Sequence, residues 1–254
     1  MSRSNSAPID KTLAILEAVS ALRRPVSITD ISVATSIPAP TVHRIAAQLI
    51  ERRLLRRVVS SRRFLPGPRL MQLGLECVQS QIYADKPHVL LKSLAVEVGE
   101  FALISMVLDD ELVCIDSASV HRSTGLHFEQ GYRAPLHCTS IGKLYLSQLS
   151  DMHLDAWLKA SCLRPYSAKT ISKTDELRQH CMEVRRLGYA SCNEEYNPGV
   201  VGCGVSIPLS DKAGFLGLCI SAPSARLSHD QIVRYVPRLH KVAQQISREV
   251  ERHS

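Results

Sequence analysis

Hydrophobic residues recur at helical spacing in three separate segments of the first fifty residues. Residues 10–22 place apolar side chains three or four positions apart and predict a first helix. Residues 27–30 (SITD) have the form of a capping box, which predicts a short second helix over 29–36. After a tight turn, an apolar stripe predicts a longer third helix from about Pro40 to Arg52.

A short helix, a tight turn and a longer helix are the plan of a helix-turn-helix, whose second helix lies in the major groove of DNA. Polar side chains beside the apolar stripe can donate hydrogen bonds to base edges, as arginine does to guanine and glutamine to adenine. The predicted base-reading residues are Thr41, His43, Arg44 and Gln48. An ordinary amphipathic helix with a polar outer face is the alternative, and the helix pattern alone does not separate the two.

The residues that follow the third helix favour DNA binding. Residues 54–59 are typical of a strand, residues 60–63 of a basic turn, and residues 64–65 begin a return strand that ends at Pro66. A hairpin with arginines at its base and tip is typical of a wing, whose guanidinium groups contact phosphates or the minor groove. The candidate arginines are Arg52, Arg53, Arg56, Arg57, Arg62 and Arg63. We therefore expect residues 1–67 to form a winged helix-turn-helix domain.

The rest of the chain predicts a linker helix over 68–85 and a second domain over 86–254. Two pairs of apolar strands, at 101–118 and 200–223, surround turn signals at 109–110 and 211–214. Helices are predicted between these hairpins and at the end of the chain. This order indicates an α+β domain with a mainly antiparallel sheet.

The composition fits a two-domain globular protein. The chain has 254 residues, of which 45% are hydrophobic and 22% are charged. It has no run of about 18 apolar residues that would suggest a membrane span, and its N-terminus lacks the apolar core of a signal peptide. We expect a cytoplasmic protein with no membrane partner.

The charge of the chain is divided unevenly. Residues 1–66 contain 11 Lys and Arg against 4 Asp and Glu, whereas residues 67–254 contain 20 of each. The formal net charge of +7 therefore belongs to the first quarter of the chain. Such an asymmetry favours a polyanionic partner, with a solvated basic face as the alternative.

The eight cysteines leave one rival function open. None forms a Cys-x-x-Cys pair, and cysteines beside apolar residues usually behave as small buried hydrophobes. Metal sites can also be built from dispersed residues. Here the candidates are Cys138, Cys192, Cys203 and Cys219 with His127 or His137. We expect no metal and no cofactor, and keep a cysteine-based metal or redox sensor as the alternative.

Enzymatic chemistry is not expected. The chain has no Gly-rich phosphate loop, His-Glu-x-x-His or Gly-x-Ser-x-Gly motif. The neighbours His137 and Cys138, like Glu194 and Glu195, would point to opposite faces of a strand and so could not act as a pair.

Besides the enzyme and the cysteine-based sensor, a further alternative is a DNA-binding protein that binds no ligand.

Over nearly its whole length the chain resembles the IclR-type bacterial regulators. The first domain carries TLAILEAVS, SITDISVATSIPAPTVHRIAAQLIERRLLRR and FLPGPRL, and the second carries GYRAPLHCTSIGKLYLS, RRLGYASCNEEYNPGV and LCISAPSARLS. The chain departs from the usual pattern with Pro40 in place of Ser and Arg53 in place of Gly. The resemblance implies a GAF-like effector domain that senses a small carboxylate or aromatic metabolite. It also implies homodimers or homotetramers on operator DNA, with control of a catabolic operon.

The resemblance further implies the position of an effector pocket, at Ser140, Ile141, Cys192, Gly202, Cys219 and Ser221. A physical argument supports part of it, because the helix that begins at Ser140-Ile141-Gly142 has free N–H groups that favour an anion. Cys219 and Ser221 are two apart on one strand and share a face. The alternative is that these residues serve only packing and capping.

Overall fold

The computed structural model describes residues 8–22, 24–58, 61–83, 86–120, 128–209 and 214–251. It consists of two compact units, Met1–Cys77 and Val78–Ser254, which we describe separately. Within the described residues, no helix is both long and apolar enough to cross a lipid bilayer. Residues 59–60 of the predicted wing, His127 and residues 211–213 of a predicted turn lie outside the described residues.

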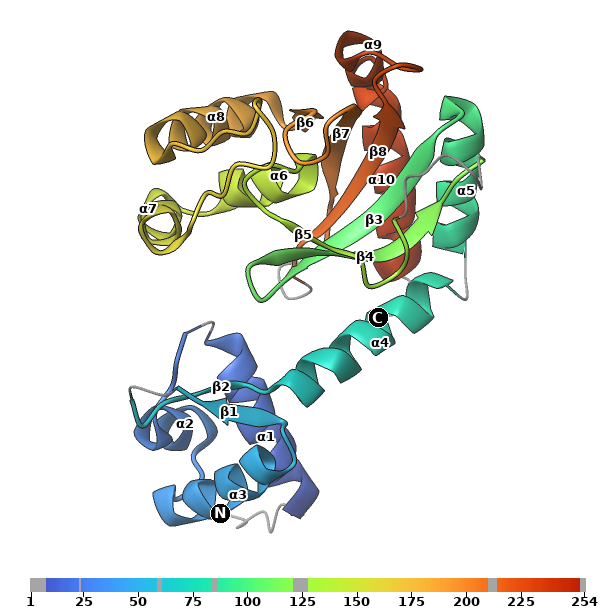
Figure 1. Cartoon of the computed structure of the whole chain (residues 1–254). Coiled ribbons are helices and arrows are strands. Elements are labelled where there is room, and N and C mark those ends of the chain that lie inside the picture. The colour runs from blue at the N-terminus through green and yellow to red at the C-terminus, as the bar shows by residue number, and fades with distance from the viewer. Residues whose placement is uncertain are drawn as a thin grey trace. The chain divides into compact units, whose positions relative to one another are not determined.

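The first unit is a winged helix-turn-helix (Figure 1). Its elements are α1 (Pro8–Ala21), α2 (Ile28–Thr35), α3 (Ala39–Glu51), β1 (Leu55–Arg57) and β2 (Phe64–Pro66), and α4 (Pro68–Tyr83) follows. The capping box is confirmed: the Ser27 hydroxyl accepts the Asp30 N–H, and the Asp30 carboxylate accepts the Ser27 N–H. Ile15, Ile31, Val42, Leu49 and Phe64 belong to one buried core that joins the helices to the hairpin.

Arg53 connects α3 to the wing in a left-handed conformation, with φ +60°. Its carbonyl accepts the Arg69 N–H, which ties the end of α3 to the start of α4. A β-carbon costs about 1–2 kcal/mol in this region, while glycine loses about 0.5–1 kcal/mol more backbone entropy on folding. We therefore expect Arg53→Gly to stabilise the first unit by up to about 1 kcal/mol, measured by hydrogen exchange of core amides in α1–α3.

Arg52 provides the matched control for this substitution. It is also an exposed arginine, but its φ is −83°. Arg52→Gly relieves no strain and should destabilise the same amides by about 0.5–1 kcal/mol. Equal effects at the two positions would contradict the role given to the left-handed backbone of Arg53.

The second unit is built on one six-stranded sheet. Its strands are β3 (Phe101–Leu108), β4 (Glu111–Ala118), β5 (Arg133–Pro135), β6 (Ala190–Asn193), β7 (Val200–Ile207) and β8 (Leu216–Pro223). They lie in the order β5-β4-β3-β8-β7-β6, and every neighbouring pair is antiparallel. Asp109 and Asp110 both have positive φ, as a tight hairpin turn between β3 and β4 requires. The predicted α+β class with an antiparallel sheet is confirmed.

Helices cover both sides of this sheet (Figure 1). On one side lie α5 (Lys86–Val98) and α10 (Val236–Glu251), and on the other lie α6 (Ser140–Gln148), α7 (Asp151–Ala160) and α8 (Thr174–Leu187). Since successive side chains of a strand point to opposite faces, Leu103 and Cys219 face α6 while Ile104 and Ile220 face the other side. The strands are therefore apolar along nearly their whole length.

Several details differ from the sequence prediction. The helix predicted at the end of the chain is two helices, α9 (His229–Val233) and α10, because Pro237 has no N–H to continue the first. Residues 172–175 (SKTD) have the form of a capping box, but α8 does not use it: Lys173 is the N-cap residue and makes no side-chain cap. His137 and Cys138 lie in a turn rather than on a strand. The elements α7, β5 and β6 were not predicted.

Candidate functional site

The recognition helix α3 separates its buried and exposed residues as predicted. Val42, Ile45, Ala46 and Leu49 are buried against the core. On the opposite side, His43, Arg44 and Gln48 are exposed and Thr41 is half-buried. This face presents hydrogen-bond donors to solvent in a regular order, which is the arrangement that a major-groove helix needs.

The wing brings only some of the candidate arginines near this helix. Arg57 and Arg62 border a hollow together with His43 and the first residues of α2 and α3. The Arg57 guanidinium lies 5.7 Å from the centre of the Phe64 ring, so stacking holds it in place. Arg63 is exposed, but one of its N–H groups donates to the Pro25 carbonyl at 3.1 Å. Arg52, Arg53 and Arg56 are exposed and do not border the hollow.

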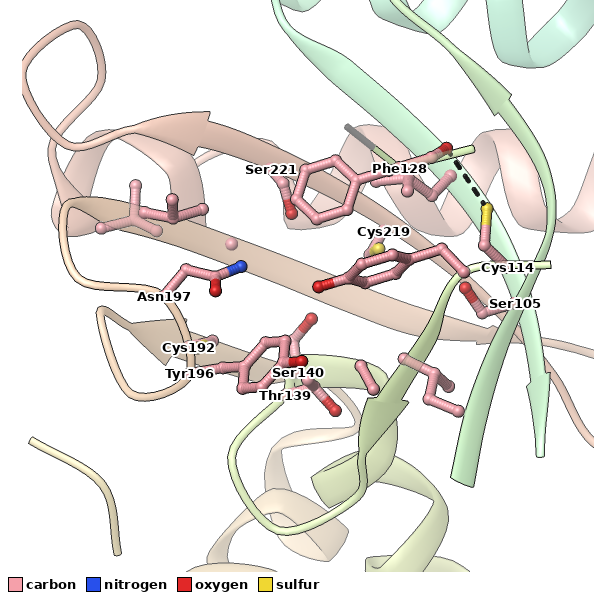
Figure 2. Close-up of a pocket in the computed structure, with 17 residues that line it drawn as sticks. Ser105, Cys114, Phe128, Thr139, Ser140, Cys192, Tyr196, Asn197, Cys219 and Ser221 are labelled. Atoms are coloured by element: carbon pink, nitrogen blue, oxygen red, sulfur yellow. Dashed lines mark hydrogen bonds between the residues drawn. The ribbon is translucent and has the colours of Figure 1, made fainter. Parts of the chain in front are cut away.

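The second unit contains a pocket between the sheet and the start of α6 (Figure 2). It holds about 600 Å³ of empty space, including its opening to solvent. The lining residues are Leu103, Ser105, Leu112, Cys114, Phe128, Tyr132, Ala134, Thr139, Ser140, Cys192, Tyr196, Asn197, Val200, Val201, Gly202, Cys219 and Ser221. None of these described lining residues carries a charged side chain.

Five of the seven predicted effector residues line this pocket: Ser140, Cys192, Gly202, Cys219 and Ser221. Figure 2 shows Ser140 of α6, Ser221 of β8 and Asn197 of the segment between β6 and β7 pointing into it. Gly202 keeps the space between the two serines open, because a β-carbon there would lie 3.1 Å from Ser221 Oγ and 3.9 Å from Ser140 Oγ.

The other two predicted residues lie outside the lining. Ile141 is fully buried and packs over Gly204 and Gly217, where a β-carbon would meet its side chain at 2.4 Å. A β-carbon on Gly142 would lie 2.3 Å from the Leu136 carbonyl oxygen. Both positions therefore serve the packing of α6 against the sheet and the preceding turn.

Sequence reasoning missed the residues that close the pocket from irregular segments. Phe128 and Tyr132 precede β5, and Tyr196 and Asn197 lie between β6 and β7. The rings of Phe128 and Tyr132 meet edge to face, 5.7 Å apart. These segments have no hydrophobic periodicity, and the turn signal Asn-Pro-Gly at 197–199 was the only local indication of the second one.

Burial raises the pKa of the cysteine thiols that line the pocket. Burial, together with the nearby Asp116 carboxylate, raises the pKa of Cys114 to about 12. Burial also raises the pKa of Cys192 and of Cys219. Across the described part of the chain, no three His, Cys, Asp or Glu side chains gather in a group that could hold a metal ion. His127, a possible partner in the cysteine-based alternative, lies outside the described residues.

A half-buried histidine of α8 is expected to make the stability of the second unit depend on pH. Burial lowers the pKa of His180 to about 4, and the positive charge of Lys143 adds to the shift. Between about pH 6.5 and pH 4 the unfolded chain binds a proton that the folded unit does not, so stability falls as pH falls, by at most about 1.4 kcal/mol per pH unit. Urea unfolding at pH 7 and pH 5, followed by fluorescence of Trp157, the one tryptophan of the chain, measures this loss.

His180→Phe should remove most of this pH dependence. His240 is exposed on α10, so His240→Gln should keep it. An unchanged pH dependence in His180→Phe would show that another group is responsible.

The two units together define the class of the protein. A winged helix-turn-helix followed by an antiparallel α+β unit with a pocket defines a transcriptional regulator with an effector-binding domain. Residues 8–58 match the IclR helix-turn-helix domain, and residues 76–248 match the bacterial transcriptional regulator IclR C-terminal family. The chain belongs to the IclR family of bacterial transcriptional regulators. The family and the similar proteins compared with this chain are transcriptional regulators, not enzymes.

The sequence similarity to known regulators covers almost the whole chain. The probable transcriptional regulator SauR of Cupriavidus necator is 29% identical over 246 residues, which cover 97% of this chain and 98% of the relative. The transcriptional repressor IclR of Escherichia coli is 22% identical over 241 residues, which cover 94% of this chain and 88% of the relative.

Solved structures show the same fold. A putative transcriptional regulator, RHA06195 from Rhodococcus, matches with a TM-score of 0.65 and 24% identity, covering 97% of this chain and 98% of that one. IclR of Thermotoga maritima matches with a TM-score of 0.61 and 23% identity, covering 95% and 98%. The family and the fold class expected from the sequence are confirmed.

Proposed function

We propose that this regulator binds operator DNA through α3 and the wing, and that a small metabolite in the pocket controls this binding. The observation that carries the proposal is the pocket itself, in which hydroxyl and amide groups converge inside an apolar wall. Such a combination is typical of sites that select a small organic molecule. Ligand binding would shift the population between DNA-competent and DNA-incompetent arrangements. In this proposal, residues 1–67 bind DNA, 68–85 form the linker and 86–254 sense the ligand.

The proposed ligand is a small molecule with an aromatic ring or a carboxylate. Phe128 and Tyr132 offer ring edges and faces, while the Ser140 hydroxyl and the positive dipole end of α6 favour one anionic group. The absence of charged side chains from the described lining disfavours a ligand with several charges. An IclR homologue from Microbacterium hydrocarbonoxydans was crystallised with 4-hydroxybenzoate, which supports the same class of ligand here.

Thermal unfolding with a panel of small acids tests the proposal. The panel contains benzoate, 4-hydroxybenzoate, pyruvate and glyoxylate as probes. A compound that binds only the folded state raises the melting temperature, and this rise should disappear in Gly202→Leu, whose side chain fills the space between the serines. Gly74→Leu, at an open position of α4, is the control that should keep the rise. No stabilisation of the wild type by any panel member would contradict the proposed pocket.

The proposed DNA-bound form is a homodimer or homotetramer, because one recognition helix reads too few bases for specificity. Dimeric helix-turn-helix proteins read half-sites roughly 10 base pairs apart or multiples of this spacing. Light scattering of the protein with and without operator DNA measures the assembly. Specific binding by a monomer would contradict this part of the proposal. The regulated genes are proposed to form a catabolic operon.

A further inference from the structure

A buried ion pair lies directly behind the pocket. Lys143 on α6 is completely buried, with 0% of its surface exposed, and its Nζ lies 2.5 Å from Glu195 Oε1. Glu195 is 7% exposed, and the same oxygen accepts the Asn193 N–H at 3.3 Å. The other carboxylate oxygen of Glu195 is buried without a hydrogen-bond partner among the described residues. Glu195 is therefore an ion-pair partner of Lys143 whose second carboxylate oxygen is not satisfied.

Stability alone does not account for this pair. Taking two charges out of water costs several kcal/mol per ion, and apolar replacements of buried pairs are often neutral or stabilising. The unpartnered oxygen of Glu195 adds to the cost. A pair of this kind is better explained by what it positions than by the free energy that it contributes.

The pair joins two walls of the pocket. Lys143 follows Thr139 and Ser140 by about one helical turn, and both of these residues line the pocket. Glu195 directly precedes Tyr196 and Asn197, which line the pocket from the segment between β6 and β7. The ion pair thus fixes the wall made by α6 to the wall made by this segment, across a sequence separation of 52 residues.

Hydrogen bonds from residues outside α6 also hold the backbone around Glu195. The Thr170 hydroxyl donates to the Glu195 carbonyl at 2.5 Å, and the Ser167 hydroxyl donates to it at 3.3 Å. The Gly199 N–H donates to the Glu194 carboxylate, which closes the far end of the same segment. Within the described part of the chain, the Lys143 ion pair is the connection through charged groups between this segment and α6.

We infer that Lys143 and Glu195 are positioning residues that set the separation of the two pocket walls and so control ligand affinity. The inference rests on the proposed function of the pocket and deepens it. Neither residue lines the pocket, so neither is expected to touch the ligand. Replacing the pair should open the pocket while the unit stays folded.

Thiol labelling tests this opening without any ligand. Cys192 lines the pocket between the two walls, and its thiol donates to the Cys138 carbonyl at 3.2 Å. In Lys143→Met/Glu195→Gln, we expect the labelling rate of Cys192 by N-ethylmaleimide to rise about tenfold, as local opening becomes easier. Peptide mass spectrometry follows each cysteine separately, and the exposed Cys162 should react at its wild-type rate in the same sample.

The matched control is Glu100→Gln/Arg226→Met. This pair also has a nearly buried carboxylate and a 2.5 Å contact, but neither of its residues lines the pocket. Its removal should leave the Cys192 rate unchanged. An unchanged Cys192 rate in Lys143→Met/Glu195→Gln would overturn the inference.

Loss of the cooperative Trp157 unfolding transition in Lys143→Met/Glu195→Gln would also overturn the inference, since the pair would then be required for folding itself. The acid panel tests the proposed function separately. If no acid stabilises the wild type, the ligand site is contradicted while the labelling result still decides whether the pair positions the walls.

Discussion

Gly142→Ala is expected to destabilise the second unit by about 1–3 kcal/mol or more, as overpacking of a closed site does. The new β-carbon would lie 2.3 Å from the Leu136 carbonyl oxygen and 2.4 Å from its Cα. Both are backbone atoms, which cannot turn aside as a flexible side chain can. The turn before α6 would have to move, and with it Thr139, whose hydroxyl caps this helix at the Gly142 N–H. Urea unfolding followed by Trp157 fluorescence measures the loss.

Gly74→Ala is the control for this substitution. Gly74 lies in α4 with no atom within 4 Å of an added β-carbon, so alanine should stabilise that helix by about 1 kcal/mol. Its amide exchange reports this change, because Trp157 lies in the other unit. If Gly142→Ala unfolded at the wild-type urea concentration, the close packing of α6 on the turn would be disproved.

The first unit was predictable because its signals are local. The Ser27–Asp30 capping box and the apolar stripe of α3 each involve residues a few positions apart, and they placed α2 and α3 within about one residue. The hairpin of β3 and β4 could also be predicted from the sequence, since two aspartates between apolar runs specify a tight turn.

The edges of the second sheet were not predictable by the same means. Strands β5 and β6 have three and four residues, too few to show alternation. They form only because distant strands, β4 and β7, offer them backbone partners. Helix α7 had a usable signal that was overlooked, namely the Ser150 hydroxyl that accepts the His153 N–H. The break before α10 was also readable, from Pro237.

The pocket shows the same limit. Cys219 and Ser221 share a strand face by simple alternation, so the sequence could place them together. At the start of α6, however, the sequence could not tell which residue faces the pocket. That orientation depends on Ile141 fitting over Gly204 of β7 and Gly217 of β8, which are far from it in the sequence. Phe128 and Asn197 arrive from irregular segments whose paths depend on tertiary contacts.

Arg44→Ala is expected to lower operator affinity by about 5- to 150-fold, which corresponds to about 1–3 kcal/mol for a bidentate base contact. Arg44 is exposed on the face of α3 opposite the buried residues Val42 and Ile45. Because a base contact discriminates between base pairs, the loss should be large on the natural operator and small on an operator already changed at the contacted pair. Footprinting of the variant across a set of operator mutants measures both effects.

Arg62→Ala is the matched comparison, because Arg62 is also an exposed arginine and lies in the wing. A phosphate contact carries no sequence information, so this variant should weaken binding to every operator by a similar factor. The slope of log K against log[salt] should also fall in magnitude by about 1. In Arg44→Ala the slope of log K against log[salt] should change less than in Arg62→Ala, while discrimination at one base pair is lost. If Arg44→Ala instead weakened all operators equally, Arg44 would be a phosphate contact, and sequence reading would fall to His43 and Gln48.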